Sequence, residues 1–159
     1  LEYLEHGNIA LVSEAGTPSV SDPGSQLIRA VSKTTHVVSP VPGPSAVTAA
    51  ISIAGLPLDQ WLFIGFLPRK SGQKKKMLLW ARENNTSLVF FESPYRVISS
   101  LNLIHELFPS ANLVICREIT KFYEEIFRGT AQEALQQFVK PKGEFTIVIE
   151  NTKTKSTSL

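Results

Sequence analysis

The sequence contains little cysteine, histidine or aspartate, and each shortage excludes a class of site. Cys116 is the only cysteine, so the chain forms no internal disulfide and holds no cysteine-rich zinc site. The three histidines, at positions 6, 36 and 105, lack the spacing of metal ligands, and we expect no protein-bound metal. A single thiol is also typical of a reducing compartment, and we expect a cytoplasmic location.

Long apolar runs and three common motifs are absent as well. No run of about 18 apolar residues is present, which counts against a membrane-spanning helix. The sequence contains no G-x-G-x-x-G, no G-x-x-x-x-G-K-[ST] and no G-x-S-x-G. A dinucleotide-binding turn, a nucleoside-triphosphate loop and a hydrolase with a serine elbow are therefore not expected.

The composition is that of an ordinary globular protein, but its cations are unevenly distributed. The 159 residues are 43% hydrophobic and 19% charged, enough for one compact domain or two small lobes. A net charge of +2 is too small to indicate a nucleic-acid partner by itself. Five cations nevertheless fall between positions 69 and 76: Arg69, Lys70, Lys74, Lys75 and Lys76.

Strand and helix patterns alternate along the chain. Short apolar runs predict strands at 8–13, 36–39, 61–66, 87–92, 112–119, 124–129 and 144–150. Helical periodicity predicts helices at 25–33, 46–55, 74–84, 94–107 and 130–139. The alternation predicts an α/β fold, with a mostly parallel sheet in the first half of the chain. We expect the aromatic residues Trp61, Trp80, Phe90 and Phe91 to lie in the core.

The polar linker GLPLDQ, at 55–60, divides this pattern into two lobes. We expect residues 1–57 to form the C-terminal part of an N-terminal α/β lobe and residues 58–151 to form a C-terminal mixed α/β lobe. Residues 152–159 form a polar segment without caps, for which we expect disorder. A cleft between two lobes is a common place for a ligand.

Two turns rich in proline and glycine follow the first two predicted strands. They are SEAGTPSVSDPG, at 13–24, and PVPGPSA, at 40–46. In open α/β sheets, ligands bind at the carboxyl ends of the strands, and glycine lets a ligand approach the main chain closely. The turns are thus candidates for a polar ligand-binding wall. A tight connection that binds nothing is the alternative interpretation.

Seven segments occur in a fixed order: SEAGTPSVSDPG, PVPGPSA, GFLPRK, FFESPYR, REITKFYEE, RGT and KGEFTIVIE. Together, over residues 1–151, they resemble the tetrapyrrole methylase superfamily and, within it, the ribosomal RNA small subunit methyltransferase I family. That family resembles porphyrin and corrin methylases in fold, but it methylates the ribose 2′-hydroxyl of a cytidine in small-subunit (16S) rRNA. The resemblance therefore implies a two-lobed tetrapyrrole-methylase-like fold and a methyltransferase.

The resemblance also implies a cofactor, S-adenosylmethionine (SAM), held in the cleft between the lobes. The positions that match the family's cofactor wall are Ala15, Gly16, Thr17, Pro18, Ser21, Asp22, Gly43, Pro44, Ser45 and Ala46. The chemistry agrees, because carbonyl and hydroxyl oxygens suit a cationic sulfonium better than a basic pocket does.

The sequence departs from the family at its N-terminal end. Members begin with a strand and a P-I-G-N-type loop that forms the opposite wall of the site, and neither is present here. The chain also does not begin with Met and opens on a helix-like segment, LEYLEHG. We therefore expect further sequence to precede it, and we expect the 159 residues alone to bind SAM weakly and to methylate nothing. We also expect a homodimer that covers the apolar face left by the absent strands.

The basic cluster has two interpretations. It is either a solvated loop and helix start or a contact surface for RNA phosphates. Cations at a helix N-terminus oppose the helix dipole, which favours the second interpretation. The candidate RNA-binding residues are Arg69, Lys70, Lys74, Lys75, Lys76 and Arg96, with Arg117, Lys121 and Arg128 as further cations.

Methyl transfer to a hydroxyl needs alignment of the reacting atoms and gains from a general base. Glu92 and Lys121 are the candidate catalytic residues, although Glu92 is as well explained by structural pairing with a basic neighbour, and the segment around Lys121 by a charged ladder. The alternative functions are a tetrapyrrole, corrin or diphthine-type methylase of the same superfamily, or an inactive fragment that binds SAM or RNA. Five adjacent cations favour RNA over a porphyrin-like substrate.

Overall fold

The computed structural model describes residues 1–58 and 60–151, which belong to two compact units, Leu1–Ser45 and Ala46–Leu159. The units divide after Ser45, earlier than the lobe boundary predicted after residue 57, because helix α2 (Ala46–Ala54) packs on strands of the second unit. The predicted tail at 152–159 lies outside the described residues. Among the described helices, none has the length and apolar character needed to cross a bilayer.

The first unit contains little regular structure. Its elements are a short 3-10 helix, η1 (Glu2–Glu5), and helix α1 (Ser25–Val31). The predicted strands at 8–13 and 36–39 are wrong: both segments lie outside any strand. A strand is defined by its ladder partners, and no described segment of this unit supplies one. Val12 and Val37 are consequently 80% and 88% exposed.

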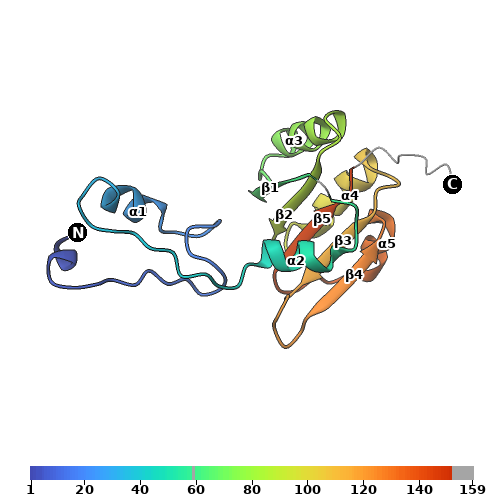
Figure 1. Ribbon diagram of the computed structural model, residues 1–159. Coiled ribbons are helices and arrows are strands. Elements are labelled where there is room, and N and C mark those ends of the chain that lie inside the picture. The colour runs from blue at the N-terminus through green and yellow to red at the C-terminus, as the bar shows by residue number, and fades with distance from the viewer. Residues whose placement is uncertain (59, 152–159) are drawn as a thin grey trace. The chain divides into compact units, whose positions relative to one another are not determined.

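The second unit is a mixed α/β layer structure (Figure 1). After α2, the chain forms β1 (Trp61–Phe66), α3 (Ser71–Glu83), β2 (Ser87–Glu92), α4 (Val97–Leu107), β3 (Leu113–Arg117), β4 (Glu125–Gly129), α5 (Ala131–Gln137) and β5 (Phe145–Ile149). Each predicted strand and helix of this half is present. Helix α3 begins three positions before its predicted start, so its three lysines occupy the fourth to sixth positions of the helix and not its first three.

The five strands form one sheet in the order β1-β2-β5-β3-β4. The β1 and β2 strands are parallel and are joined by the crossover helix α3, whereas every other pair is antiparallel. Strand β5 is the last in sequence but lies at the centre of the sheet. The register places Glu92, Phe145, Arg117 and Glu125 in one row across the sheet, at the same end.

The two faces of the sheet carry separate cores. One face packs against α3, α4 and α5 through large side chains such as Phe90, Leu101 and Ile147. The other packs against α2 through smaller residues, including Val89 and Cys116. Burial raises the pKa of the Cys116 thiol to about 11, so this cysteine is protonated at neutral pH.

The aromatic residues separate into buried and exposed ones. Phe90 is fully buried and Phe91 is half-buried, as predicted. The prediction that Trp61 and Trp80 lie in the core is wrong, since they are 37% and 48% exposed. Trp61 begins an edge strand, and Trp80 lies on the outer face of α3, opposite the buried Lys74, Leu78 and Ala81.

Candidate functional site

The two proline- and glycine-rich turns meet within the first unit. The Thr17 hydroxyl Oγ1 donates a hydrogen bond of 3.2 Å to the carbonyl oxygen of Pro44, which lies 27 positions further along the chain. A Cβ atom added to Gly16, whose φ is +71°, would lie 3.7 Å from the same carbonyl oxygen. The turn at 13–24 therefore lies against the turn at 40–45.

The turn at 13–24 has an unusual backbone. Ser19 and Ser21 have φ angles of 68° and 60°, and Gly24 has a φ of 137°. A Cβ atom at Gly24 would lie 2.5 Å from Ser19 Oγ and 2.9 Å from Leu11 Cδ2, so a larger residue does not fit there. The Ser13 hydroxyl bridges to the carbonyl oxygens of Ala15 and Gly16, both at 3.3 Å. Local hydrogen bonds and glycine thus fix the shape of this turn.

The donor set of these turns suits SAM, which carries a sulfonium and an ammonium group. Neither turn contains a lysine or an arginine, and both present carbonyl and hydroxyl oxygens. The predicted positions that are exposed are Ala15, Gly16, Thr17, Ser21, Asp22, Gly43 and Pro44. Pro18 and Ser45 are half-buried, and Ala46 begins α2 in the second unit.

A buried polar cluster connects β2, α3 and α4 in the second unit. Its centre is Glu92, which ends β2 and is 1% exposed. Oε1 of Glu92 accepts the Ser93 backbone N–H at 2.9 Å and lies 3.2 Å from Nε of Arg96. Oε2 accepts the Ser100 hydroxyl at 2.6 Å and lies 3.4 Å from Nη2 of Arg96. Both carboxylate oxygens therefore have partners within the fold.

Lys74 belongs to the same cluster. Its Nζ donates to the Ser100 hydroxyl oxygen at 3.0 Å and lies 3.5 Å from Ser99 Oγ, and the residue is 6% exposed. Desolvation lowers the pKa of Lys74, while the negative charge of Glu92 partly opposes that effect. The expectation that Lys74 shares an exposed RNA-binding surface with its neighbours is corrected by this burial.

Arg96 is also held within the fold. Besides its ion pair with Glu92, its Nη2 donates to the carbonyl oxygen of Leu67, the residue that follows β1. The guanidinium thus anchors the start of the basic loop to β2 and α4. The expectation that Arg96 contacts RNA phosphates is corrected, because its Nε and Nη2 groups contact Glu92 and the Leu67 carbonyl oxygen within the fold.

The sequence left two interpretations of Glu92 open, a catalytic base or a structural ion pair. In the structure, Glu92 forms an ion pair with Arg96. A general base must reach the proton that it removes, and a buried carboxylate with both oxygens bonded has no open path to a substrate hydroxyl. The contacts support a structural function for Glu92. Sequence reasoning missed Ser100, because Glu92 ends a strand and Ser100 lies in the helix that follows, so no fixed sequence spacing relates the two.

Lys121 lies in the hairpin between β3 and β4, between two carboxylates. Its Nζ is 2.7 Å from Glu144 Oε2 and 3.2 Å from Glu118 Oε1. Glu118 Oε1 also accepts the backbone N–H of Glu144 at 2.8 Å. The hydrogen bond to Glu144 raises the pKa of Lys121, and the Glu144 backbone N–H lowers that of Glu118. A lysine held protonated in this way is a poor base.

We expect Lys121→Met to lower the free energy of unfolding by less than about 1 kcal/mol at pH 7, because the ion pairs are exposed. Glu118 has a lowered pKa, so its stabilisation is present above its ordinary pKa of about 4.3 and is lost as the pH falls further. The difference in Tm between parent and variant should therefore shrink below about pH 4. Thermal unfolding at several pH values measures it, with Lys140→Met as the control. An unchanged difference at acid pH would contradict the pairing.

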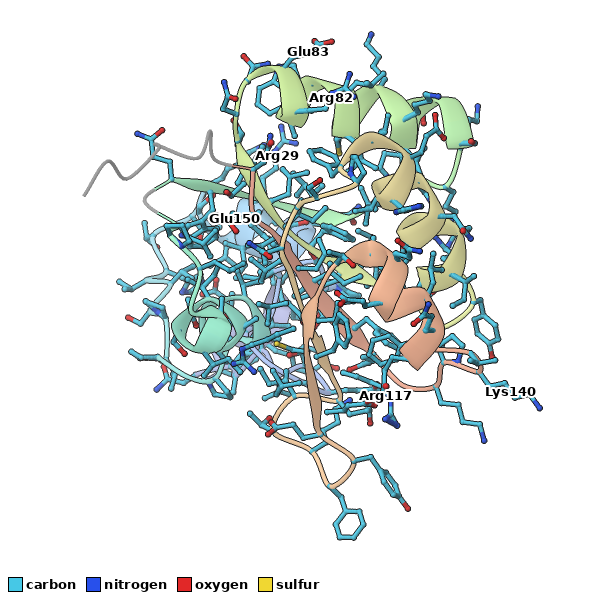
Figure 2. The ribbon with its side chains drawn as sticks, turned by 90° about the vertical axis from the view of Figure 1, so that its right-hand side faces the viewer. Arg29, Arg82, Glu83, Arg117, Lys140 and Glu150 are labelled. Atoms are coloured by element: carbon cyan, nitrogen blue, oxygen red, sulfur yellow. The ribbon has the colours of Figure 1, made fainter. Side chains whose placement is uncertain are left out.

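Four cations of the basic cluster remain exposed: Arg69, Lys70, Lys75 and Lys76. They surround the first turns of α3. Lys75 Nζ lies 2.6 Å from Glu106 Oε1 of α4, in an exposed pair. The further cations predicted from the sequence lie elsewhere: Arg117 Nη1 is 2.8 Å from Glu125 Oε2, and Arg128 donates to the carbonyl oxygen of Ile53 at 2.6 Å. Figure 2 shows Arg117 in the lower part of the view, far from the labelled end of α3.

Comparison with known proteins identifies the family. The model of the Tetrapyrrole (Corrin/Porphyrin) Methylases matches residues 1–135. A protein of Thermotoga maritima named "Ribosomal RNA small subunit methyltransferase I" is 41% identical over 152 residues, which are 94% of this chain and 68% of that protein. The protein of the same name from Halalkalibacterium halodurans is 38% identical over 97% of this chain and 54% of its own length. The chain thus spans about half to two thirds of the length of these relatives.

Two solved structures share the fold. The methyltransferase CobJ matches 86% of this chain and 62% of its own chain, with a TM-score of 0.66 and 20% sequence identity. The cobalt precorrin-4 methyltransferase CbiF matches 84% of this chain and 60% of its own, with a TM-score of 0.59 and 16% identity. With its family match and its relatives, the chain belongs to the tetrapyrrole methylase family and, within it, to the ribosomal RNA small subunit methyltransferase I proteins.

Proposed function

We propose that the protein containing this chain transfers a methyl group from SAM to the ribose 2′-hydroxyl of a cytidine in small-subunit rRNA. The observation that carries the proposal is the run of relatives named for that rRNA, at 38–41% identity over nearly the whole chain. The solved corrin methyltransferases, at 16–20% identity, share the fold alone. A tetrapyrrole, corrin or diphthine-type substrate is therefore the second candidate.

The paired turns of the first unit supply the residues that would hold the cofactor. The Thr17 and Ser21 hydroxyls, the Asp22 carboxylate and the backbone at Gly16 and Gly43 are the groups available to it. When bound, SAM supplies a methyl group on a good leaving group. The remaining positions of these turns within the first unit, Ala15, Pro18, Pro44 and Ser45, would limit its mobility by packing.

Neither Glu92 nor Lys121 is retained as the base in this proposal. Their contacts assign both to structural ion pairs. Much of the rate enhancement in such a transfer can come from alignment of the hydroxyl oxygen with the methyl carbon. The exposed cations Arg69, Lys70, Lys75 and Lys76 would position the RNA through its phosphates, while the pocket selects the nucleotide.

A homodimer and a cytoplasmic location belong to the same proposal. Val12, Val37 and Val41 of the first unit are each at least 80% exposed, which is a costly arrangement unless another surface covers them. A second copy of the protein is the partner that we propose. The proposed substrate places the reaction with the ribosome, in the cytoplasm.

The experiment is methyl transfer by the full-length protein to small ribosomal subunits that lack the modification. We expect one 2′-O-methylcytidine per subunit, detected by mass spectrometry of nucleosides, with free rRNA and large subunits as controls. A parallel incubation with a corrin precursor tests the second candidate. Methylation of the corrin but not of the RNA would overturn the proposal.

A further inference from the structure

The outer face of α3 forms a shallow groove that lies outside the cofactor-binding turns and the buried Glu92 cluster. Its cavity volume is about 390 Å³, and it is lined by Gly72, Lys75, Lys76, Leu79, Trp80 and Glu83. Each of these positions has another of them three or four residues away along the helix, and together they therefore share one face. Figure 2 shows Glu83 at the outer end of this helix, directed away from the sheet. We call this surface the α3 groove.

Trp80 is the aromatic residue of the α3 groove. It is 48% exposed, whereas Leu78 and Ala81 on the opposite face are fully buried. The helix is thus anchored by its inner face, and the indole presents a large apolar surface to solvent. Successive bases of single-stranded nucleic acid stack on aromatic side chains of this kind, whatever their sequence.

The charged residues around Trp80 indicate which kind of partner the α3 groove binds. Lys76 lies one helical turn before Trp80 and, among the residues that the structure describes, forms no ion pair. Lys75 is exposed despite its pair with Glu106, and Arg69 and Lys70 precede the helix. The cations lie before Trp80 in the helix and the Glu83 carboxylate lies after it, so a base on the indole would have its phosphates on the side of the cations. This arrangement fits a base and its adjoining phosphates better than it fits an apolar protein surface.

Gly72 lies at the N-terminal end of α3 and leaves that end of the α3 groove open. A Cβ atom added there would meet nothing within 4 Å, so the helix backbone itself forms the floor. A ligand can approach this part of the helix closely. Because the space at this Cβ position is open, a larger side chain at Gly72 provides a means of blocking the groove from a position that does not face the core.

We infer that the α3 groove binds an unpaired segment of RNA, with one base stacked on Trp80 and its phosphates near Lys76. The inference rests on the proposed function and adds to it a stacking contact outside the cofactor-binding turns. It makes Trp80 a positioning residue for the substrate, not a catalytic one. Stacking contributes affinity that does not depend on salt, unlike the phosphate contacts.

The test uses the full-length protein and a single-stranded RNA of about ten nucleotides. We expect Trp80→Ala to weaken binding about tenfold with the salt dependence unchanged, and Trp80→Phe to restore most of the affinity. Gly72→Leu should weaken binding similarly with no loss of thermal stability. Tryptophan fluorescence should be quenched by RNA in the parent, and the part of the quench due to Trp80 should disappear in Trp80→Phe. Trp61→Phe is the matched control, for which affinity should not change.

Two outcomes would overturn the inference. RNA affinity and quenching that are unaltered in Trp80→Ala and Gly72→Leu would exclude stacking in the α3 groove. A change of molecular mass in solution for these variants, without a change in RNA affinity, would show that a second copy of the protein covers the groove. Failure of the unchanged protein to methylate small subunits, with quenching intact, would instead count against the proposed function alone.

Discussion

Replacement of Glu92 by glutamine is expected to lower the free energy of unfolding of the second unit by about 3–5 kcal/mol. The carboxylate is buried and forms contacts with Arg96 and Ser100, and through Ser100 it is linked to Lys74. Its removal leaves a buried ammonium and a half-buried guanidinium without their counterion. Such uncompensated charges are among the largest single-residue losses seen in proteins.

Urea unfolding of the parent and of Glu92→Gln measures this loss. Glu106→Gln is the matched control, because it removes the exposed partner of Lys75 and should cost less than about 1 kcal/mol. Addition of Lys74→Met to Glu92→Gln should recover part of the stability, since the second change removes a charge that the first left unpaired. A loss of less than about 1 kcal/mol in Glu92→Gln would contradict a structural function for the cluster.

The pH dependence offers a second measurement on the same cluster. Because the pKa of Lys74 is lowered in the fold, the unfolded chain binds more protons in the alkaline range and stability should rise with pH there. Without Glu92, the pKa of Lys74 should fall further, so that the rise begins at lower pH. The parent and Glu92→Gln should therefore differ less in stability at pH 10 than at pH 7.

Removal of the four exposed cations together should weaken RNA binding about a hundredfold at 0.1 M salt. The variant is Arg69→Ala, Lys70→Ala, Lys75→Ala and Lys76→Ala in the full-length protein. Each phosphate contact contributes about 0.7 to the slope of log K against log salt for a single strand, so the slope should fall by about 3. SAM affinity should be unchanged, because these residues lie outside the cofactor-binding turns.

Two controls separate this effect from a general change of charge. Lys140→Ala removes an exposed cation that follows α5 and should leave the slope unaltered. Lys74→Ala should mainly reduce stability, because the side chain is buried against Ser100. An equal slope for the parent and the fourfold variant would reject the phosphate-contact proposal. A strong effect of Lys140→Ala would show that net charge, not this cluster, governs binding.

The difference between Lys74 and its two neighbours shows what the sequence could and could not predict. A run of three lysines looks uniform, yet successive residues of a helix point about 100° apart, so only Lys74 shares the buried face with Leu78 and Ala81. With the helix predicted to begin at 74 instead of at Ser71, the run lay in its first turn. For the same reason Trp80 was assigned to the core, although hydrophobic character alone does not specify the face.

The strand predictions were likewise correct for one part of the chain and wrong for another. Those of the second unit were predicted nearly to the residue, as at 61–66 and 87–92, because each apolar run has partners within the chain. The runs at 8–13 and 36–39 have the same local pattern but gain no ladder within the described residues. The two turns were predicted to form one ligand-binding wall from their positions after two predicted strands, and Thr17 donates to the carbonyl oxygen of Pro44 although those strands are absent. Short-range turn chemistry is enough to hold it.

The central place of β5 has a consequence for the order in which the second unit is made. Strands β2 and β3 have no ladder with each other and are joined only through β5, which is the last of the five to leave the ribosome. We therefore expect that, during synthesis, β2 and β3 each lack one ladder partner until β5 has emerged. We expect the sheet to close in one late step that depends on contacts distant in sequence, such as Leu88 with Ile149. Nascent chains that stop before residue 145 should therefore be sensitive to protease along both halves, and chains released beyond it should be resistant.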